Sequence, residues 1–218
     1  NRYYRNKLLK GITPKIDKCT KNFYSYKKIK GEVIYEQKNP EIIYKLLDWL
    51  KNKLWIKKNI EQKDFTIFKN YCLEFYYKKT TNRVAKFYKI FGEKDVGGIV
   101  NNIKVESVNY ILDKINFEKL SEGIPSNFHG DLQFDNILLT KNKEFKLLDW
   151  RQDFSGILDY GDLYYDLAKL NGGIYVSYKK VKNGDFKYKG DLTDCMISIS
   201  NDKFLSDSKL IFNKFVKE

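Results

Sequence analysis

The stretch that decides the fold is His129-Gly130-Asp131-Leu132-Gln133-Phe134-Asp135-Asn136-Ile137-Leu138-Leu139-Thr140. His129 is the only histidine of the chain, and Asp131 and Asn136 follow it closely. A second segment, Phe145-Lys146-Leu147-Leu148-Asp149, ends in an aspartate 18 positions after Asp131. Both segments are rich in β-forming residues, and Lys141-Asn142-Lys143 between them is typical of a turn. We therefore expect a β-hairpin that carries polar side chains at its ends.

The spacing of these polar residues suits phosphoryl transfer. In that reaction one carboxylate sits beside the incoming hydroxyl, while an amide oxygen and a second carboxylate hold the magnesium that bridges the nucleotide phosphates. A hairpin of fixed length returns the chain from Asn136 to Asp149, so both oxygen ligands are expected to face one cation. Asp135 and Asn142, taken singly, are as well explained as turn-capping residues, and neither is assigned a role.

Three strings of residues together resemble a known family. They are His129-Gly130-Asp131 through Asn136, Leu147-Leu148-Asp149-Trp150, and Tyr160-Gly161-Asp162-Leu163-Tyr164-Tyr165-Asp166-Leu167-Ala168. The pattern is similar to that of the aminoglycoside phosphotransferase and choline kinase family, and it extends over most of the chain. The resemblance implies an α+β, protein-kinase-like fold with a mainly helical C-terminal lobe, a catalytic β-hairpin, and part of a smaller β-rich N-terminal lobe.

The resemblance also implies a role for each candidate residue. Asp131 would be the catalytic base or hydroxyl-orienting residue, and His129 would brace the catalytic loop. Asn136 and Asp149 would be the magnesium ligands. The enzyme would move the γ-phosphate of ATP, with GTP as the alternative donor, to a hydroxyl of a small metabolite such as choline, an amino alcohol, a sugar or an amino sugar.

Two departures from the protein-kinase pattern bear on the acceptor. Gly130 stands where protein kinases carry an arginine that reads a phosphorylated activation loop. No Ala-Pro-Glu segment follows Asp149. A small-molecule acceptor is therefore favoured over a protein.

Residues 1–35 are expected to form the remnant of a small N-terminal lobe with the inter-lobe linker, and residues 36–218 the large helical catalytic lobe. The segment Tyr26-Lys27-Lys28-Ile29-Lys30-Gly31 resembles the linker between the two lobes of this family. The backbone of Lys28 and Ile29 is therefore expected to meet the adenine edge. A full family member carries a phosphate-covering loop, a strand lysine and a helix glutamate upstream of this linker. We expect the sequence to be a fragment, because its only methionine is Met196. The alternative is a kinase-like module that binds a ligand without catalysis.

Hydrophobic periodicity predicts the remaining elements. Apolar residues at helical spacing indicate helices at 39–54, 65–76 and 84–91, and we expect their stripes to be core. Another helix is expected from about Asp159 to Gly172-Gly173, with Asp162 and Asp166 in structural roles, satisfying backbone amides. Residues 174–200 are expected to be extended, and 206–216 to form a final short helix.

Composition limits the class of protein. The 218 residues are 42% hydrophobic, which is enough for a core, and no run of about 18 apolar residues predicts a membrane span. Cys19, Cys72 and Cys195 are odd in number and widely spaced, which favours a reducing, cytoplasmic setting. Binding of nucleic acid would rest on the net charge of +13 alone, yet only four of the 41 basic residues are arginine. A lysine-rich solvated surface is the simpler interpretation, and no specific nucleic-acid partner is expected.

The sequence leaves the acceptor and the oligomeric state open. A polycationic aminoglycoside would favour an acidic cleft, whereas residues 209–218 hold more lysine than carboxylate. Choline would favour an aromatic cage, and four aromatic residues lie near the magnesium ligands in sequence: Trp150, Tyr160, Tyr164 and Tyr165. A sugar or another polyol fits a basic protein equally well.

Overall fold

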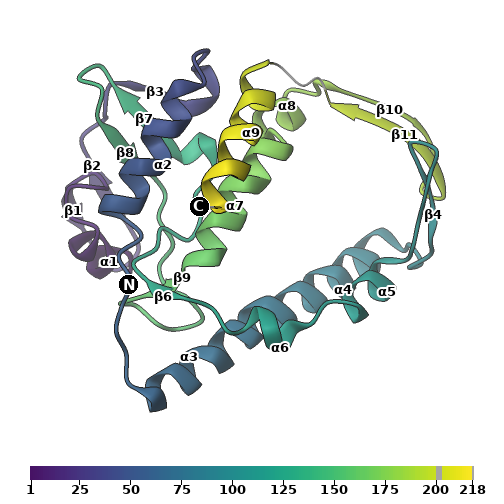
Figure 1. Ribbon diagram of the computed structural model, residues 1–218, viewed down its shortest axis with the longest axis horizontal. Helices are drawn as coiled ribbons and strands as arrows, with labels where there is room; N and C mark the ends of the chain where they lie inside the picture. The colour runs from purple at the N-terminus through teal and green to yellow at the C-terminus, as the bar shows by residue number, and fades with distance from the viewer. Residues whose placement is uncertain (200–202, 218) are drawn as a thin grey trace. The chain divides into compact units, whose positions relative to one another are not determined.

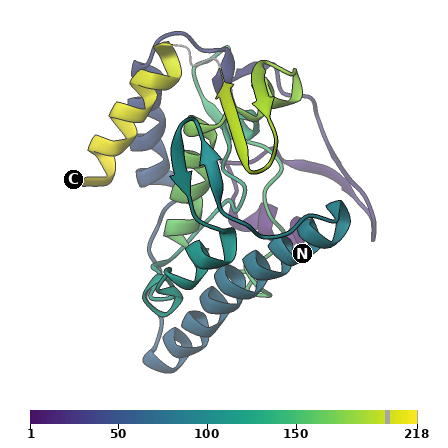
Figure 2. The ribbon, with the colours of Figure 1, turned by 90° about the vertical axis from the view of Figure 1, so that its right-hand side faces the viewer.

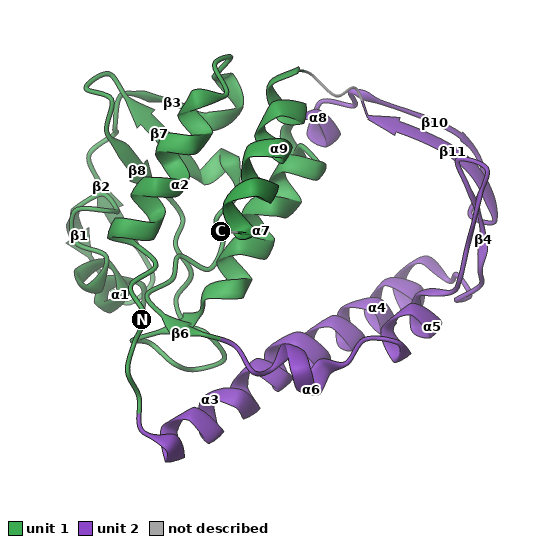
Figure 3. Cartoon of the chain, viewed as in Figure 1, with its two compact units in different colours: residues 1–60, 124–179, 201–218 green, residues 61–123, 180–200 purple. Residues whose placement is uncertain are grey.

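The computed structural model describes residues 1–199 and 203–217 of the chain. It divides into two compact units (Figure 3): unit 1 holds 1–60, 124–179 and 201–218, and unit 2 holds 61–123 and 180–200. Helices and several small sheets occur together, so the expected α+β class is confirmed. The lobe boundary at residue 35 and the kinase-like arrangement stay predictions. In the described ranges, every helix is too short or too polar to cross a membrane.

Unit 1 contains the segment that decides the fold (Figure 1). Its elements are α1 (Arg2–Leu8), β1 (Ile16–Cys19), β2 (Tyr24–Tyr26), β3 (Gly31–Val33), the 3-10 turn η1 (Ile34–Glu36), α2 (Glu41–Lys53), β6 (Pro125–Ser126), the 3-10 turn η3 (Phe134–Asn136), β7 (Ile137–Thr140), β8 (Phe145–Leu147), β9 (Gly161–Asp162), α7 (Leu163–Tyr175) and α9 (Lys203–Lys217). The short helix α8 (Tyr178–Lys182) crosses the boundary between the units.

The predicted hairpin is present as β7 and β8. Ile137 pairs with Leu147 and Leu139 with Phe145, and Lys143 turns the chain with a φ of 64°. On its other edge β7 pairs with β3, which gives an antiparallel sheet in the order β3-β7-β8. The strand at residues 31–33 therefore joins the β7–β8 hairpin directly.

The core of unit 1 lies between this sheet and three helices. Helix α9 packs against both α2 and α7 (Figures 1 and 2). The buried side chains recur at helical spacing along α2, and others come from η3, the sheet, α7 and α9: Ile43, Leu46, Leu47, Leu50, Phe134, Ile137, Leu147, Leu170, Ile174, Phe204 and Phe212. Burying a side chain of this size contributes about 1.5–3 kcal/mol, so this layer holds the hairpin in place.

Two helix boundaries in unit 1 differ from the predictions. Helix α7 begins at Leu163 with Asp162 as its N-cap, and it runs through Gly172 and Gly173 to Tyr175. The glycine pair does not end the helix because Gly173 is buried under Tyr35, whose hydroxyl donates to its carbonyl at 2.8 Å. Tertiary packing thus overrides the local helix-ending signal. The last helix is also longer than predicted, since it begins at Lys203.

Unit 2 consists of one long helical run and a small sheet. Its elements are α3 (Gln62–Leu73), the π-helical turn η2 (Glu74–Lys78), α4 (Lys79–Phe91), β4 (Gly98–Val100), β5 (Ile103–Val105), α5 (Val108–Asp113), α6 (Phe117–Leu120), β10 (Phe186–Gly190) and β11 (Asp194–Ile199). The sheet order is β10-β11-β4-β5, with β11 and β4 parallel. The expected extended stretch is therefore a helix followed by a hairpin, and Ser200 lies outside the described residues.

The apolar stripe predicted for residues 84–91 is not core. Phe68, Cys72 and Phe75 are buried as expected, but Phe87 and Phe91 on α4 are 46% and 64% exposed. The π turn at 74–78 adds a residue to one turn and rotates the following stripe. The apolar face of α4 therefore does not continue the buried apolar face of α3.

Candidate active site

Asp131 and Asn136 lie together beside the start of the hairpin. The Asn136 Nδ2 atom donates to the Asp131 main-chain oxygen at 2.8 Å and contacts its carboxylate Oδ2 at 3.3 Å. The 3-10 turn η3 makes this possible, because it brings the chain back within five residues. The two residues therefore form one hydrogen-bonded pair.

Asp149 lies just beyond the last strand of the same hairpin. The Leu148 N–H donates to the Asn136 carbonyl at 2.8 Å, which extends the β7–β8 ladder by one step. Asn136 and Asp149 consequently flank the same open end of the hairpin. Asp149 has a left-handed φ of 53°, a conformation that aspartate tolerates better than most residues. Its carboxylate is 58% exposed.

His129 connects the loop before β7 with the chain after β8. Its imidazole is completely buried, Nδ1 accepts from the Asp131 N–H at 3.2 Å, and Nε2 lies 2.8 Å from the Leu148 carbonyl. These partners assign the proton of the neutral ring to Nε2. Burial lowers the pKa of His129 to about 4, so the ring is neutral at pH 7.

Asp166 fixes the same loop from helix α7. Its Oδ2 accepts from the His129 N–H and its Oδ1 from the Gly130 N–H, both at 2.7 Å. The carboxylate is fully buried, and burial raises the pKa of Asp166 to about 6 although the amide hydrogen bonds act in the opposite direction. Asp162 caps α7 by accepting from the Tyr164 N–H at 3.1 Å. The structural roles expected for both aspartates are confirmed, with the loop amides as the partners of Asp166.

Arg5 is a buried cation that sequence reasoning missed. It is 1% exposed, and it donates to the carbonyls of Phe128, Leu158 and Arg151 while its guanidinium lies 3.8 Å from the centre of the Phe128 ring. Burial lowers the pKa of Arg5 to about 10. A signal was present, because arginine is rare in this lysine-rich chain and its planar fork is suited to several carbonyls at once.

Gly130 is required by the geometry of the loop. Its φ is +88°, and a Cβ atom there would lie 2.5 Å from the Arg151 Cβ. Arg151 cannot easily move away, because its N–H donates to the His129 carbonyl at 2.9 Å. The position can therefore hold no side chain without rearrangement of the loop.

Two cations contact the candidate carboxylates. The Lys169 Nζ lies 2.8 Å from Asp131 Oδ1, and the Arg2 Nη1 lies 2.5 Å from Asp149 Oδ1. Sequence reasoning missed both. Lys169 had a usable signal, because it follows Asp166 by three positions and therefore shares its face of α7.

The structure also locates the predicted linker residues and the aromatic residues near the candidate site in sequence. Lys28 and Ile29 lie in the segment between β2 and β3, and the role of their backbone stays a prediction. Trp150 is completely buried, and its Nε1 donates to the Arg2 carbonyl at 2.9 Å. Trp150 is thus a core residue and cannot be a wall of an open aromatic cage, whereas Tyr164 is exposed.

The donor set at the hairpin end suits magnesium. Asn136 directs Nδ2 to Asp131, which leaves its amide oxygen for a cation, and the Asp149 carboxylate has a second oxygen besides the one near Arg2. Magnesium keeps several waters and needs one or two protein oxygens beside substrate phosphates. A protein-only cage of three or more His, Cys, Asp or Glu side chains does not occur among residues 1–199 and 203–217.

A scan of the chain against protein-family models gives no match, and searches of curated proteins and of solved structures give none either. No relative therefore adds a function to the geometry above. The functional assignment depends on the residues at the open end of the hairpin and on the loop that His129, Asp166 and Arg5 hold.

The buried His129 predicts a specific pH dependence of stability. Its pKa is about 4 in the folded chain and 6.5 ordinarily, so the unfolded chain takes up the proton first as the pH falls. The stability that His129 contributes is complete above about pH 6.5 and decreases down to about pH 4. The advantage of the wild type over His129→Gln should shrink by roughly 3 kcal/mol between pH 7 and pH 4.

Urea unfolding of both proteins at pH 4, 5, 6 and 7 measures this difference. Asp166 titrates in the same range, but it is present in both proteins and its contribution cancels in the comparison. Two stability curves that run parallel across this range would show that His129 is not buried in its neutral form.

Proposed function

We propose that the chain is the catalytic part of an ATP- and magnesium-dependent phosphotransferase that acts on a hydroxyl of a small metabolite. The observation that carries the proposal is that Asn136, at one end of the β7–β8 hairpin, donates to Asp131, while the N–H of Leu148, the residue before Asp149, donates to the Asn136 carbonyl. The acceptor classes are choline, an amino alcohol, a sugar or an amino sugar, and GTP can replace ATP as the donor.

Each residue has a distinct part in this reaction. The acceptor hydroxyl oxygen forms a bond to the γ-phosphorus, the bond from that phosphorus to the bridging oxygen breaks, and Asp131 takes the hydroxyl proton. Asn136 and Asp149 would hold magnesium, which neutralises charge on the nucleotide phosphates. Lys169, 2.8 Å from Asp131, compensates the carboxylate charge and supplies a cation near the transferred group.

The loop geometry supports this assignment, because phosphoryl transfer depends on positioning more than on covalent chemistry. Asp131 is held through its main chain by His129 and Asn136, and the two preceding amides are held by Asp166. A loop with so many buried partners can keep a carboxylate in one place.

A second candidate function is a kinase-like module that binds a nucleotide without turnover. The ion pair between Arg2 and Asp149 favours it, since the guanidinium already neutralises the carboxylate that would hold the metal. The two functions separate experimentally: a phosphotransfer screen uses ATP and GTP with choline, ethanolamine, amino sugars, monosaccharides and nucleosides, beside calorimetry with magnesium-nucleotide. Binding without transfer to any acceptor would favour the module.

Asp149→Asn tests the metal assignment. Loss of a residue that only supports a metal ligand typically lowers metal affinity by about 10- to 100-fold. Loss of a direct ligand should therefore weaken magnesium-nucleotide binding by about tenfold or more. Turnover should fall with it. The matched control is Asp48→Asn, an exposed aspartate of α2, which should change neither quantity. Unchanged affinity of Asp149→Asn for magnesium-nucleotide in calorimetry would remove Asp149 from the metal site.

A further inference from the structure

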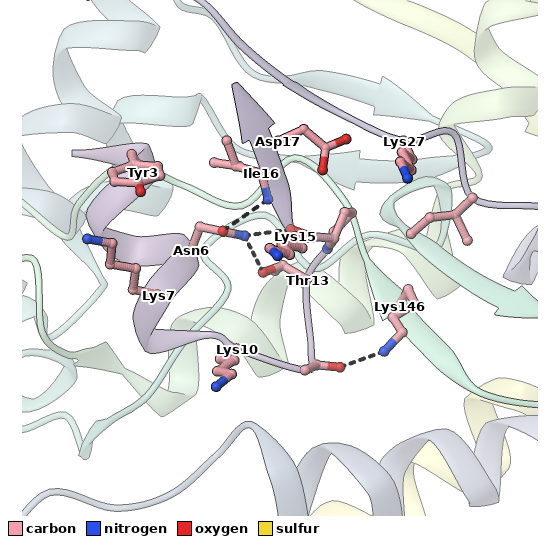
Figure 4. A pocket seen from close by; sticks show the side chains of 13 residues that line it. Tyr3, Asn6, Lys7, Lys10, Thr13, Lys15, Ile16, Asp17, Lys27 and Lys146 are labelled. Carbon is pink, nitrogen blue, oxygen red and sulfur yellow. Dashed lines mark hydrogen bonds between the residues drawn. The ribbon is translucent and has the colours of Figure 1, made fainter. Parts of the chain in front are cut away.

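A basic pocket in unit 1 lies apart from the candidate active site (Figure 4). Its volume is about 770 Å³, within the range of about 300–1,000 Å³ that is usual for small-molecule sites. Five lysines from separate segments line it, together with one carboxylate, Asp17: Lys7, Lys10, Lys15, Lys27 and Lys146. The formal charge of the lining is five minus one, or +4.

Helix α1 separates this pocket from the candidate active site. The lining residues of the helix and of the turn after it recur at helical spacing and share one face: Tyr3, Asn6, Lys7 and Lys10. Arg2 and Arg5 lie on another face, where they contact Asp149 and the loop carbonyls. The pocket is therefore a different site from the one that holds Asp131.

The walls of the pocket are fixed by hydrogen bonds. Asn6 Nδ2 donates to Thr13 Oγ1 at 2.9 Å and to the Pro14 carbonyl at 2.7 Å, as the dashed lines in Figure 4 mark. Lys146 Nζ donates to the Gly11 carbonyl at 2.7 Å from strand β8. The segment from residue 11 to 16 is thus tied to α1 on one side and to the sheet on the other, so the pocket is preformed.

The positive charge of the pocket is largely uncompensated. Among the described residues, no carboxylate forms an ion pair with Lys10, Lys15 or Lys27. Like charges gathered around a concave surface raise the local potential and attract anions. Ile16 and Ile29 add apolar surface to the same lining, which suits the organic part of a ligand.

We propose that this pocket binds a small organic molecule that carries two or more phosphate groups. Lysine ammonium groups bind phosphate as point charges, and several of them around one cavity match several phosphates. Lysines gathered around one pocket fit a metabolite better than a nucleic acid, which needs basic groups spread along its backbone. The inference rests on the lysines and on the volume of the pocket, although Ile29 of the expected adenine-binding linker also lines it.

Calorimetry of the full chain with tripolyphosphate and with fructose 1,6-bisphosphate, in magnesium-free buffer, tests the proposal. The variant Lys10→Gln/Lys15→Gln/Lys27→Gln should bind both about tenfold more weakly or worse. The matched control Lys38→Gln/Lys45→Gln/Lys53→Gln removes the same charge from exposed lysines of unit 1 outside the pocket, and it should stay within about twofold of wild type. All six lysines are exposed, so both variants should fold, and circular dichroism checks this.

Four results would overturn the proposal. Equal losses in the two triple variants would mean that net charge alone attracts the anions. Binding that depends on Arg2, tested with Arg2→Gln, would assign the anion to the candidate active site. Absence of binding by the wild type at millimolar probe, or tighter binding of a 20-base-pair DNA duplex that the pocket variant loses, would exclude a small-molecule site.

Discussion

Asp131→Asn is expected to lower phosphotransfer turnover by roughly two to four orders of magnitude, the usual range for a positioned acid–base group. Magnesium-nucleotide affinity should stay within a few-fold of wild type. The reason is that a loose phosphoryl-transfer transition state leaves the carboxylate with the acceptor hydroxyl, which it orients and whose proton it takes late. Asp131 has no part in holding the nucleotide in this scheme.

The side-chain geometry indicates that Asp131→Asn leaves the loop conformation in place. Asn136 Nδ2 donates mainly to the Asp131 main-chain oxygen, and this bond survives the change. The contacts that change are those of the carboxylate: Lys169 at 2.8 Å loses its charge partner, and the longer contact of Asn136 Nδ2 with Oδ2 is altered. Lys169→Met separates the two effects, because it removes the cation while Asp131 stays in place.

Steady-state rates and nucleotide titration of the same preparations provide the measurement. Asp149→Asn is the informative contrast, since it should weaken nucleotide binding and turnover together. Retention of more than about a tenth of wild-type turnover by Asp131→Asn would disprove its catalytic role.

The hairpin could be predicted from the sequence because its determinants are local. Strand-forming runs on both sides of Lys141-Asn142-Lys143 define β7 and β8, and the turn residues define their register. The same locality makes Asn136 and Leu148 neighbours in the ladder, with Asp149 next along the chain. That the side chains of Asn136 and Asp149 hold one cation stays a prediction.

The partners of the supporting residues could not be predicted because they are distant in sequence. Arg5 binds carbonyls more than 120 positions away, and Asp166 binds amides 36 and 37 positions away. Composition and periodicity carry no information on such pairs. Local signals also fail where packing opposes them, as at Gly173 under Tyr35 and at the π turn before α4.

Asp166 contacts the His129 and Gly130 amides and acts electrostatically on Arg5. Its removal should therefore have the largest effect on stability. Asp166→Ala leaves the buried N–H groups of His129 and Gly130 without an acceptor and removes a negative charge that acts on Arg5. Removing one partner from a buried charged network costs about 3–5 kcal/mol, and we expect the free energy of unfolding at pH 7 to fall by that amount. Asp48→Ala, on the exposed side of α2, should change it by less than about 0.5 kcal/mol.

The pH dependence distinguishes this loss from simple loss of packing. The pKa of Asp166 is about 6 when folded, above its ordinary value of 3.8, so the folded chain takes up the proton first as the pH falls. The stability contributed by this titration is complete below about pH 4 and is lost as the pH rises through about 6. The deficit of Asp166→Ala relative to wild type should therefore be larger at pH 5 than at pH 7. Chemical unfolding at both pH values measures it, and a deficit below about 1 kcal/mol, or one independent of pH, would mean that the carboxylate does not hold the loop.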